Sequence, residues 1–242
     1  MTPQETILER ISEKFKAIDQ DPNSHLEGLV WSKPITYWDY IHTDSLLSLQ
    51  IQRTTLPDEM VFILYHQNNE LLFKMILWEI DQVAFGKDLT ASFFTMKLER
   101  ISRYFDMLTS SFSIMQNGME TEQYLKFRNT LTPASGFQSA QYRLIEFSST
   151  HVINLIDHRF RNTIDRKTPY EHAYNHLYWQ AAGKDHVTGK KSTLIQLFEE
   201  RYKTEFIRSM ERYNESNLWS TFKALDDSAK TNELIKAMRD YD

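Results

Sequence analysis

Glycine and proline, the residues that most often interrupt regular structure, are scarce in this chain. Only six of each occur among 242 residues, about half of their usual share. Few tight turns can form, because such turns commonly need one or the other. Aromatic residues make up 13% of the chain, and their bulk suits packing between long helices or the lining of a pocket. We therefore expect an all-α protein with no significant sheet.

Apolar spacing and capping signals predict a series of helices. Pro57 suits the first turn of one of them, and Asp58 and Glu59 favour the positive end of its dipole. Thr90 and Gly118 fit the start and end of the next. Residues 19–28 and 149–189 are expected to be irregular. No repeat or linker is evident, so residues 1–242 are expected to form a single helical domain. The expected helices cover residues 7–18, 36–50, 57–84, 90–118, 119–131, 138–147, 194–213 and 217–242.

The composition excludes several kinds of site and partner. The net charge is −5, and the basic residues are scattered among acidic ones, which argues against a nucleic-acid partner. The absence of cysteine excludes disulfides, thiolate catalysis and cysteine-bound metals. The polar start "MTPQETILERISEKFKAIDQ" is no signal peptide. No apolar run reaches the roughly 20 residues that cross a bilayer. We expect a cytoplasmic protein without a membrane partner.

The stretch "FILYHQNNELLFKMILWEI", residues 62–80, reads as a buried helix with five polar residues at its centre. An unpartnered polar group in a core costs roughly 1–3 kcal/mol, so these residues need partners. Glu70 is placed to reach Lys74, four residues on. His66 shares a face with Phe62 and Phe73, and it is either a hydrogen-bonded core histidine or one whose free nitrogen points into a cavity.

A second cluster lies in "YLKFRNTLTPASGFQSAQYR", residues 124–143. Arg128 follows Tyr124 by four residues, which places both on one helical face. An arginine among aromatic rings can bind a carboxylate through two parallel hydrogen bonds, but a surface arginine with a buried stem gives the same pattern. The "TPASGF" turn allows the backbone to approach a flat ligand closely, or it is a plain corner between helices.

Metal-binding motifs are weak in this sequence. His172 and His176, in "HAYNH", have the i, i+4 spacing of a metal pair. They lack the glutamate of HExxH and a third ligand. No Glu-x-x-His pair supports a ferritin-like di-iron site.

Three stretches together resemble the tryptophan 2,3-dioxygenase family. They are "TYWDYIHTDSLLSLQ", "DEMVFILYHQNNELLFKMILWEI" and "YLKFRNTLTPASGFQSAQYRLIEF", and their order and separations also match. The similarity is strongest over residues 36–147. It implies a long-helix bundle of the tryptophan/indoleamine 2,3-dioxygenase type. It also implies a homotetramer with one haem b per subunit.

The reaction that the resemblance implies is insertion of O2 across the indole C2–C3 bond of L-tryptophan. The product is N-formylkynurenine, in the kynurenine pathway of tryptophan catabolism. His66 matches the catalytic histidine that accepts a hydrogen bond from the indole N–H. Arg128 matches the arginine that binds the substrate carboxylate. The other implied residues contact substrate (Phe62, Tyr124, Phe127 and Leu131), contact haem (Phe62, Ser135 and Gly136), or close a neighbouring subunit's pocket on its substrate (Tyr37, Tyr40 and Ile41).

One feature of the family is missing from the sequence. The family's proximal haem histidine lies late in the chain, before a glycine-rich "GTGGS"-like segment, and neither is found here. No histidine of this chain matches that ligand, so no metal ligand is assigned. The end, "TNELIKAMRDYD", keeps a helical period without a stop signal, and the chain is expected to lack its C-terminal part. The alternative is an inert homologue that binds indole or haem without turnover.

Overall fold

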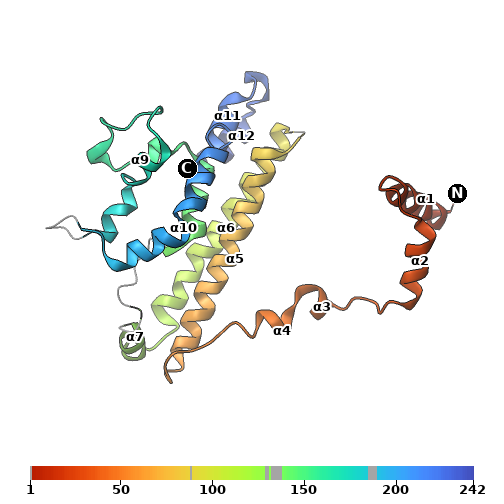
Figure 1. Ribbon diagram of the computed structural model, residues 1–242, viewed down its shortest axis with the longest axis horizontal. Helices are drawn as coiled ribbons and strands as arrows, with labels where there is room; N and C mark the ends of the chain where they lie inside the picture. The colour runs from red at the N-terminus through yellow and green to blue at the C-terminus, as the bar shows by residue number, and fades with distance from the viewer. Residues whose placement is uncertain (1, 88, 129–130, 132–137, 185–189) are drawn as a thin grey trace. The chain divides into compact units, whose positions relative to one another are not determined.

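The computed structural model describes residues 2–87, 89–128, 131, 138–184 and 190–242 (Figure 1). Their contacts divide the chain into two compact units, residues 1–50 and 51–242. The regular elements are helices, and only two isolated β-bridges accompany them in the described part. The chain is all-α, as predicted. The single-domain organisation stays a prediction.

The first unit contains four short helices, α1 (Pro3–Lys16), α2 (Pro22–Trp31), α3 (Tyr37–Ile41) and α4 (Thr43–Leu46). Phe15 of α1 stacks on His25 of α2, with ring centroids 4.1 Å apart.

Two predictions for the first unit are wrong. Residues 19–28 were expected to be a loop, but α2 starts at Pro22, because the Asp21 carboxylate accepts the backbone N–H groups of Asn23 and Ser24. The helix expected over 36–50 is split at His42. This residue has φ 57° and ψ 45°, a left-handed conformation that a helix cannot continue through.

The second unit is built on two long helices, α5 (Asp58–Phe85) and α6 (Ala91–Asn117), which pack side by side (Figure 1). Their bounds agree closely with those predicted. Three shorter helices cover them: α8 (Ala140–Ser149), α11 (Leu218–Ala224) and α12 (Asn232–Tyr241). The core between these five helices is aliphatic, and its most deeply buried members are Ile76, Ile80, Phe94, Leu98, Ile101, Leu218 and Leu234.

A second core contains a cluster of packed aromatic rings. It lies between α8, α9 (Tyr170–Tyr174), α10 (Thr193–Arg212) and the 3-10 segment Tyr178–Gly183. Phe206 packs against the rings of Phe147 and Trp179 at centroid distances of 5.7 and 6.3 Å. Because α8 contributes Ile145 to the first core and Phe147 to the second, it joins the two.

The helix predicted over residues 217–242 is also interrupted. α11 ends at Ala224, a 3-10 turn covers Asp227–Ala229, and α12 begins at Asn232. The Thr231 hydroxyl accepts the backbone N–H of Leu234 and so starts a new helix.

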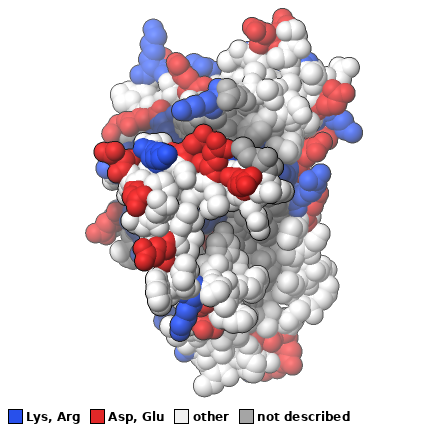
Figure 2. Space-filling view, turned by 90° about the vertical axis from the view of Figure 1, so that its right-hand side faces the viewer, with Lys and Arg blue, Asp and Glu red and all other residues white. Residues whose placement is uncertain are grey.

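The helix α5 is buried on one side only, which corrects the expectation of a buried helix over residues 62–80. Leu72, Ile76 and Ile80 are buried, whereas Leu71 and Trp78 are exposed, Trp78 by 69%. None of the described helices combines the length and apolar character that a bilayer crossing needs. Figure 2 shows both acidic and basic side chains among mostly uncharged residues.

Candidate functional site

The start of α5 is held by the buried carboxylate of Glu59. It accepts the backbone N–H groups of Arg53 at 3.0 Å and Thr54 at 2.7 Å, and the Thr54 hydroxyl at 2.7 Å. Burial opposes ionisation of this group, but hydrogen bonds from Thr54 and Arg53 outweigh it and lower the pKa of the Glu59 carboxyl. These bonds fix the first turn of α5, and Phe62 follows one turn later.

The helix α7 (Thr121–Arg128) is tied to the same end of α5. The Asp58 carboxylate accepts the Glu120 N–H at 2.6 Å, and the Asp58 N–H donates to the Gln123 amide oxygen at 3.2 Å. The sequence suggested only a dipole role for Asp58, because its partners lie more than 60 residues away. These two bonds position α7 beside the part of α5 that carries His66.

An aromatic cluster fills the space between α5 and α7. The ring of Phe62 lies 5.4 Å from Phe127, 6.2 Å from Tyr124 and 4.1 Å from His66, between centroids. Phe127 is fully buried. The cluster therefore connects His66 on one helix with the last turn of the other, where Arg128 lies.

The side chain of His66 is exposed, which excludes the core histidine that the sequence left open. Its Nδ1 lies 2.8 Å from the Phe62 carbonyl oxygen. A carbonyl only accepts hydrogen bonds, so Nδ1 carries the hydrogen, and Nε2 of the neutral ring is an acceptor. His66 thus presents a hydrogen-bond acceptor beside an aromatic surface, which suits a ring N–H such as that of indole.

The guanidinium of Arg128 lies 5.9 Å from the Tyr124 ring centroid, so the predicted shared face is confirmed. The side chain is exposed, and it forms no ion pair with any described residue. The adjacent Lys126 is paired with Glu122 at 2.6 Å. Arg128 is therefore a cation without a carboxylate partner in the described chain, one helical turn from an aromatic cluster.

Of the other polar residues in the middle of α5, Glu70 links the helix to its neighbour, whereas the buried side-chain oxygen of Asn69 has no hydrogen-bond partner among the described residues. Glu70 accepts the Gln141 side-chain amide through its carbonyl at 2.7 Å and its carboxylate at 2.9 Å. This bond joins α5 to α8. The expected ion pair between Glu70 and Lys74 does not form within the described residues. The polar centre of α5 is thus divided between an exposed acceptor, His66, and a link to another helix, Glu70.

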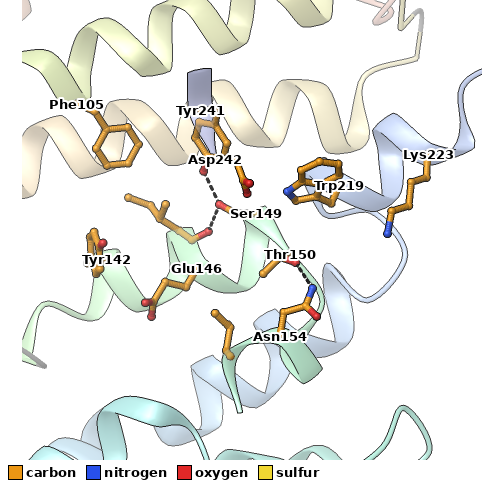
Figure 3. A pocket seen from close by; sticks show the side chains of 12 residues that line it. Phe105, Tyr142, Glu146, Ser149, Thr150, Asn154, Trp219, Lys223, Tyr241 and Asp242 are labelled. Carbon is orange, nitrogen blue, oxygen red and sulfur yellow. Dashed lines mark hydrogen bonds between the residues drawn. The ribbon is translucent and has the colours of Figure 1, made fainter. Parts of the chain in front are cut away.

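A cleft of about 690 Å³ opens between α6, α8, α11 and α12 (Figure 3). This volume is in the range of small-molecule pockets. None of the residues predicted to bind substrate or haem lines it. It lies along the same side of α5 as His66, because Phe73 of α5 packs 5.5 Å from Tyr142 in its wall. Its walls are Phe105, Tyr142, Ile145, Glu146, Ser149, Thr150, Asn154, Leu155, Trp219, Lys223, Tyr241 and Asp242.

One wall of the cleft contains a buried charged cluster. The Arg143 guanidinium lies 3.0 Å from the Glu146 carboxylate and donates to the Tyr178 hydroxyl at 3.0 Å, and that hydroxyl donates to Glu146. Burial raises the pKa of the Glu146 carboxyl, while Arg143 and Tyr178 oppose the rise. Burial also raises the pKa of Tyr178, to about 12. The cluster keeps α8 against the segment after α9.

Comparison with known proteins shows which family this chain belongs to. The sequence profile of tryptophan 2,3-dioxygenase matches residues 24–241. The chain belongs to the tryptophan 2,3-dioxygenase family. A tryptophan 2,3-dioxygenase of Ruegeria pomeroyi is 35% identical over 147 residues, 57% of this chain and 52% of the relative. One of Ruegeria sp. (strain TM1040) is 43% identical over 115 residues, 47% and 40% of the two chains. One of Bradyrhizobium diazoefficiens is 35% identical over 131 residues, 53% and 46%.

These matches cover about half the length of each of the three tryptophan 2,3-dioxygenases. The profile match extends well beyond the segment where the resemblance was strongest, residues 36–147, and includes the second core and α12.

Several residues that the family resemblance implied are not brought together by the structure. Tyr37, Tyr40 and Ile41 are exposed on α3, in the first unit. Leu131 is half-buried, and no described ring contact or hydrogen bond joins it to the aromatic cluster between α5 and α7. Ser135 and Gly136 lie outside the described residues. Their roles in this tryptophan 2,3-dioxygenase family member stay predictions.

His172 lies in α9 and His176 lies two residues beyond its end, with ring centroids 4.8 Å apart. His176 Nδ1 donates to the His172 carbonyl oxygen at 2.9 Å. Within the described ranges, no three histidine, aspartate or glutamate side chains are grouped to hold a metal ion.

Proposed function

We propose that this protein is a haem-dependent, cytoplasmic dioxygenase that inserts O2 across the indole C2–C3 bond of L-tryptophan to give N-formylkynurenine. The observation that carries the proposal is the arrangement of His66 and Arg128 at two ends of one aromatic cluster, in a chain of the tryptophan 2,3-dioxygenase family. L-tryptophan has the features that match this arrangement. They are a flat aromatic ring with an N–H group and a carboxylate at a distance from that ring.

Each protein group has a role that follows from its chemistry. His66 Nε2 accepts the indole N–H and orients the ring. It is not a base that removes this proton, because an indole N–H is far less acidic than an imidazolium of pKa about 6.5. Arg128 binds the substrate carboxylate through paired, charge-assisted hydrogen bonds. Phe62 and Tyr124, which are partly exposed, pack against the indole and exclude water, and the fully buried Phe127 supports both rings from behind.

The described residues fit the substrate side of a haem group. His66 offers the Nε2 lone pair of its neutral ring there, since Nδ1 donates to the Phe62 carbonyl, and the family resemblance assigns that lone pair to the indole N–H rather than to iron. Phe62 offers an aromatic surface. These two residues, with Ser135 and Gly136, would contact the haem. When bound, haem supplies the binding and activation of O2, and the protein supplies position and electrostatics.

The test of this proposal is direct. The protein is expressed with haem supplementation, its absorption spectrum is recorded with and without L-tryptophan, and the products are identified under O2. We expect a Soret band that L-tryptophan shifts, and N-formylkynurenine formed in equal amount to the tryptophan lost. Haem or indole binding without product would instead support the inert homologue.

We expect the His66→Ala variant to keep measurable turnover, since an acceptor that orients the ring helps without being required. In the unaltered protein, 1-methyltryptophan, which has no indole N–H, should bind less tightly than L-tryptophan. The removal of His66 should abolish this difference. Steady-state kinetics and binding titrations of both compounds provide the measurement. Complete loss of turnover with haem still bound would show that His66 is an obligatory base.

We also propose that the protein self-associates, as a homotetramer, and that Tyr37, Tyr40 and Ile41 close the pocket of a neighbouring subunit. Support comes from their exposure, 73% for Tyr37 and 71% for Tyr40, since clustered exposed apolar groups commonly mark an interface. We expect specific activity to fall as dilution dissociates the oligomer, measured by sedimentation and kinetics at matched concentrations. A stable monomer with full activity would contradict this expectation.

A further inference from the structure

The first turns of α5 and α7 are joined by a closed ring of three hydrogen bonds. The Asp58 N–H donates to the Gln123 amide oxygen at 3.2 Å, and the Gln123 side-chain amide donates to the Glu120 carboxylate at 2.9 Å. The Glu120 backbone N–H closes the ring by donating to the Asp58 carboxylate at 2.6 Å. We call Asp58, Glu120 and Gln123 the α5–α7 clasp. Because each member both donates and accepts, the loss of any one of them opens the ring.

The clasp holds α7 at its beginning. The Glu120 carbonyl oxygen accepts the Tyr124 N–H at 3.0 Å, which is the first helical hydrogen bond of α7, and Gln123 belongs to the same turn. Hydrogen bonds are directional, whereas contacts between apolar groups are not. The aromatic cluster around Phe62 therefore keeps α7 against α5, and the clasp fixes the place along α5 at which the shorter helix begins.

The position of Arg128 depends on this first turn, because α7 is short and Arg128 is its last residue. α7 has eight residues, so Arg128 lies about 7.5 Å along the axis from Gln123, at 1.5 Å per residue. Over little more than one helical turn, a displacement at Gln123 carries through to Arg128. His66 belongs to α5 itself. A shift of α7 would therefore change the separation between Arg128 and His66 without moving His66.

We infer that the α5–α7 clasp, anchored on α5 by Asp58, sets the selectivity of this protein for a substrate that bears an α-carboxylate. The inference rests on the proposed function, in which Arg128 binds that carboxylate while His66 accepts the indole N–H. Asp58 is a positioning residue in this scheme, because it acts through Arg128. The effect can be large, since a misplacement of about 1 Å can cost roughly 100-fold in rate.

A matched pair of variants separates the clasp from the other role of Asp58, which is to place a negative charge at the positive end of the α5 dipole. Asp58→Ala removes the charge and the acceptor, whereas Asp58→Asn removes the charge but keeps an oxygen for the Glu120 N–H. We expect Asp58→Ala to lower kcat/KM for L-tryptophan about 10-fold to 100-fold. Tryptamine, which lacks the carboxylate, should lose far less. Asp58→Asn should keep most of the selectivity.

A double variant tests whether Asp58 acts through Arg128. Asp58→Ala should have no further effect on L-tryptophan in a protein that already carries Arg128→Ala, because the group that the clasp positions is then absent. Steady-state kinetics and binding titrations of L-tryptophan and tryptamine, on the haem-loaded protein, give the measurement. Circular dichroism and urea unfolding check that each variant folds.

Two variants on α7 complete the set. Gln123→Ala opens the ring without changing α5, so it should reduce the same selectivity even where Asp58→Ala impairs folding. Glu122→Ala is the control, because Glu122 is a carboxylate of the same turn that lies outside the clasp and pairs with Lys126 at 2.6 Å. Its loss should leave the ratio of the two substrates unchanged.

The amide hydrogen of Glu120 reports the clasp without any turnover. Glu120 precedes the first residue of α7, and its N–H donates to the Asp58 carboxylate. We expect hydrogen exchange at this amide to be faster in Asp58→Ala than in the unaltered protein, with Asp58→Asn closer to the unaltered protein. Exchange that Asp58→Ala leaves unchanged would show that the clasp does not hold α7 in solution.

The outcomes separate this inference from the proposed function. Equal losses for both substrates in Asp58→Ala, equal effects of Asp58→Ala and Asp58→Asn, or additive effects of Asp58→Ala and Arg128→Ala would overturn the inference and leave the dioxygenase standing. If the unaltered protein binds L-tryptophan more tightly than tryptamine, loses this difference in Asp58→Ala and forms no product, the clasp is supported and the dioxygenase is overturned. A protein that neither binds nor converts either compound would overturn both.

Discussion

The Arg128→Ala variant should weaken the use of L-tryptophan by about 2–5 kcal/mol in kcat/KM, the range for breaking a buried charge pair. The reason is that Arg128 has no ion-pair partner in the described chain, while its guanidinium lies over Tyr124 beside the cluster. A bound carboxylate would supply that partner away from water. Steady-state kinetics with L-tryptophan and with tryptamine, which lacks the carboxylate, gives the measurement. Tryptamine should lose far less.

The same helix provides a matched control for Arg128. Lys126→Ala removes a neighbouring cation that is already paired with Glu122 on the exposed side of α7. Exposed pairs contribute about 0–1 kcal/mol, so this change should hardly affect either substrate. If Arg128→Ala reduced the use of tryptamine and L-tryptophan equally, the carboxylate role would be wrong and Arg128 would be a structural residue.

The Lys97→Ala variant should lower the free energy of unfolding by about 3–5 kcal/mol, as expected when one partner of a buried ion pair is removed. Lys97 Nζ lies 2.6 Å from the Glu79 carboxylate and 2.7 Å from the Gln82 amide oxygen, and both ionic partners are buried between α5 and α6. Among the described residues, its loss leaves the half-exposed Arg100, at 3.3 Å, as the remaining cation paired with the Glu79 carboxylate, beside hydrogen bonds from Gln82 at 3.3 Å and Tyr104 at 3.4 Å. Urea unfolding followed by circular dichroism measures the change.

Two further variants test the Lys97 explanation. Arg103→Ala breaks an exposed pair on the same helix, with Glu99 at 3.6 Å, and should cost less than about 1 kcal/mol. The double variant Glu79→Gln/Lys97→Ala removes the unpaired charge but keeps the space left by the lysine, and it should recover part of the stability lost by Lys97→Ala. A double variant no more stable than Lys97→Ala would show that lost packing, rather than an unpaired charge, is responsible.

The sequence by itself determined the all-α class and the long helices. α5 and α6 were predicted within one or two residues of their ends, because Pro57, Asp58, Thr90 and Gly118 mark them through local geometry. Prediction from the sequence failed at positions where local signals compete. Pro22 read as a loop residue, although Asp21 makes it the first residue of α2, and no residue type requires the left-handed turn at His42.

The candidate site could be predicted only in part. His66 and Phe62 share a face by helical spacing, and Tyr124 and Arg128 do so likewise, but spacing within one helix cannot bring two helices together. That step depends on Asp58, whose bonds to Glu120 and Gln123 join residues more than 60 positions apart. No local sequence pattern indicates that α5 pairs with α7, or that Nε2 of His66 is available as an acceptor.

The tertiary structure alone decided which sides of α5 are covered. The sequence of residues 62–80 is apolar almost all round, so it predicted burial on every side. In the folded chain α6, α8 and α11 cover only part of the helix, and Leu71 and Trp78 stay exposed. Hydrophobicity is a property of each residue, whereas burial depends on which neighbours the fold supplies. The sequence therefore determined the helix and its chemical groups, and the packing of distant elements decided which of them form a core, a candidate site or an exposed surface.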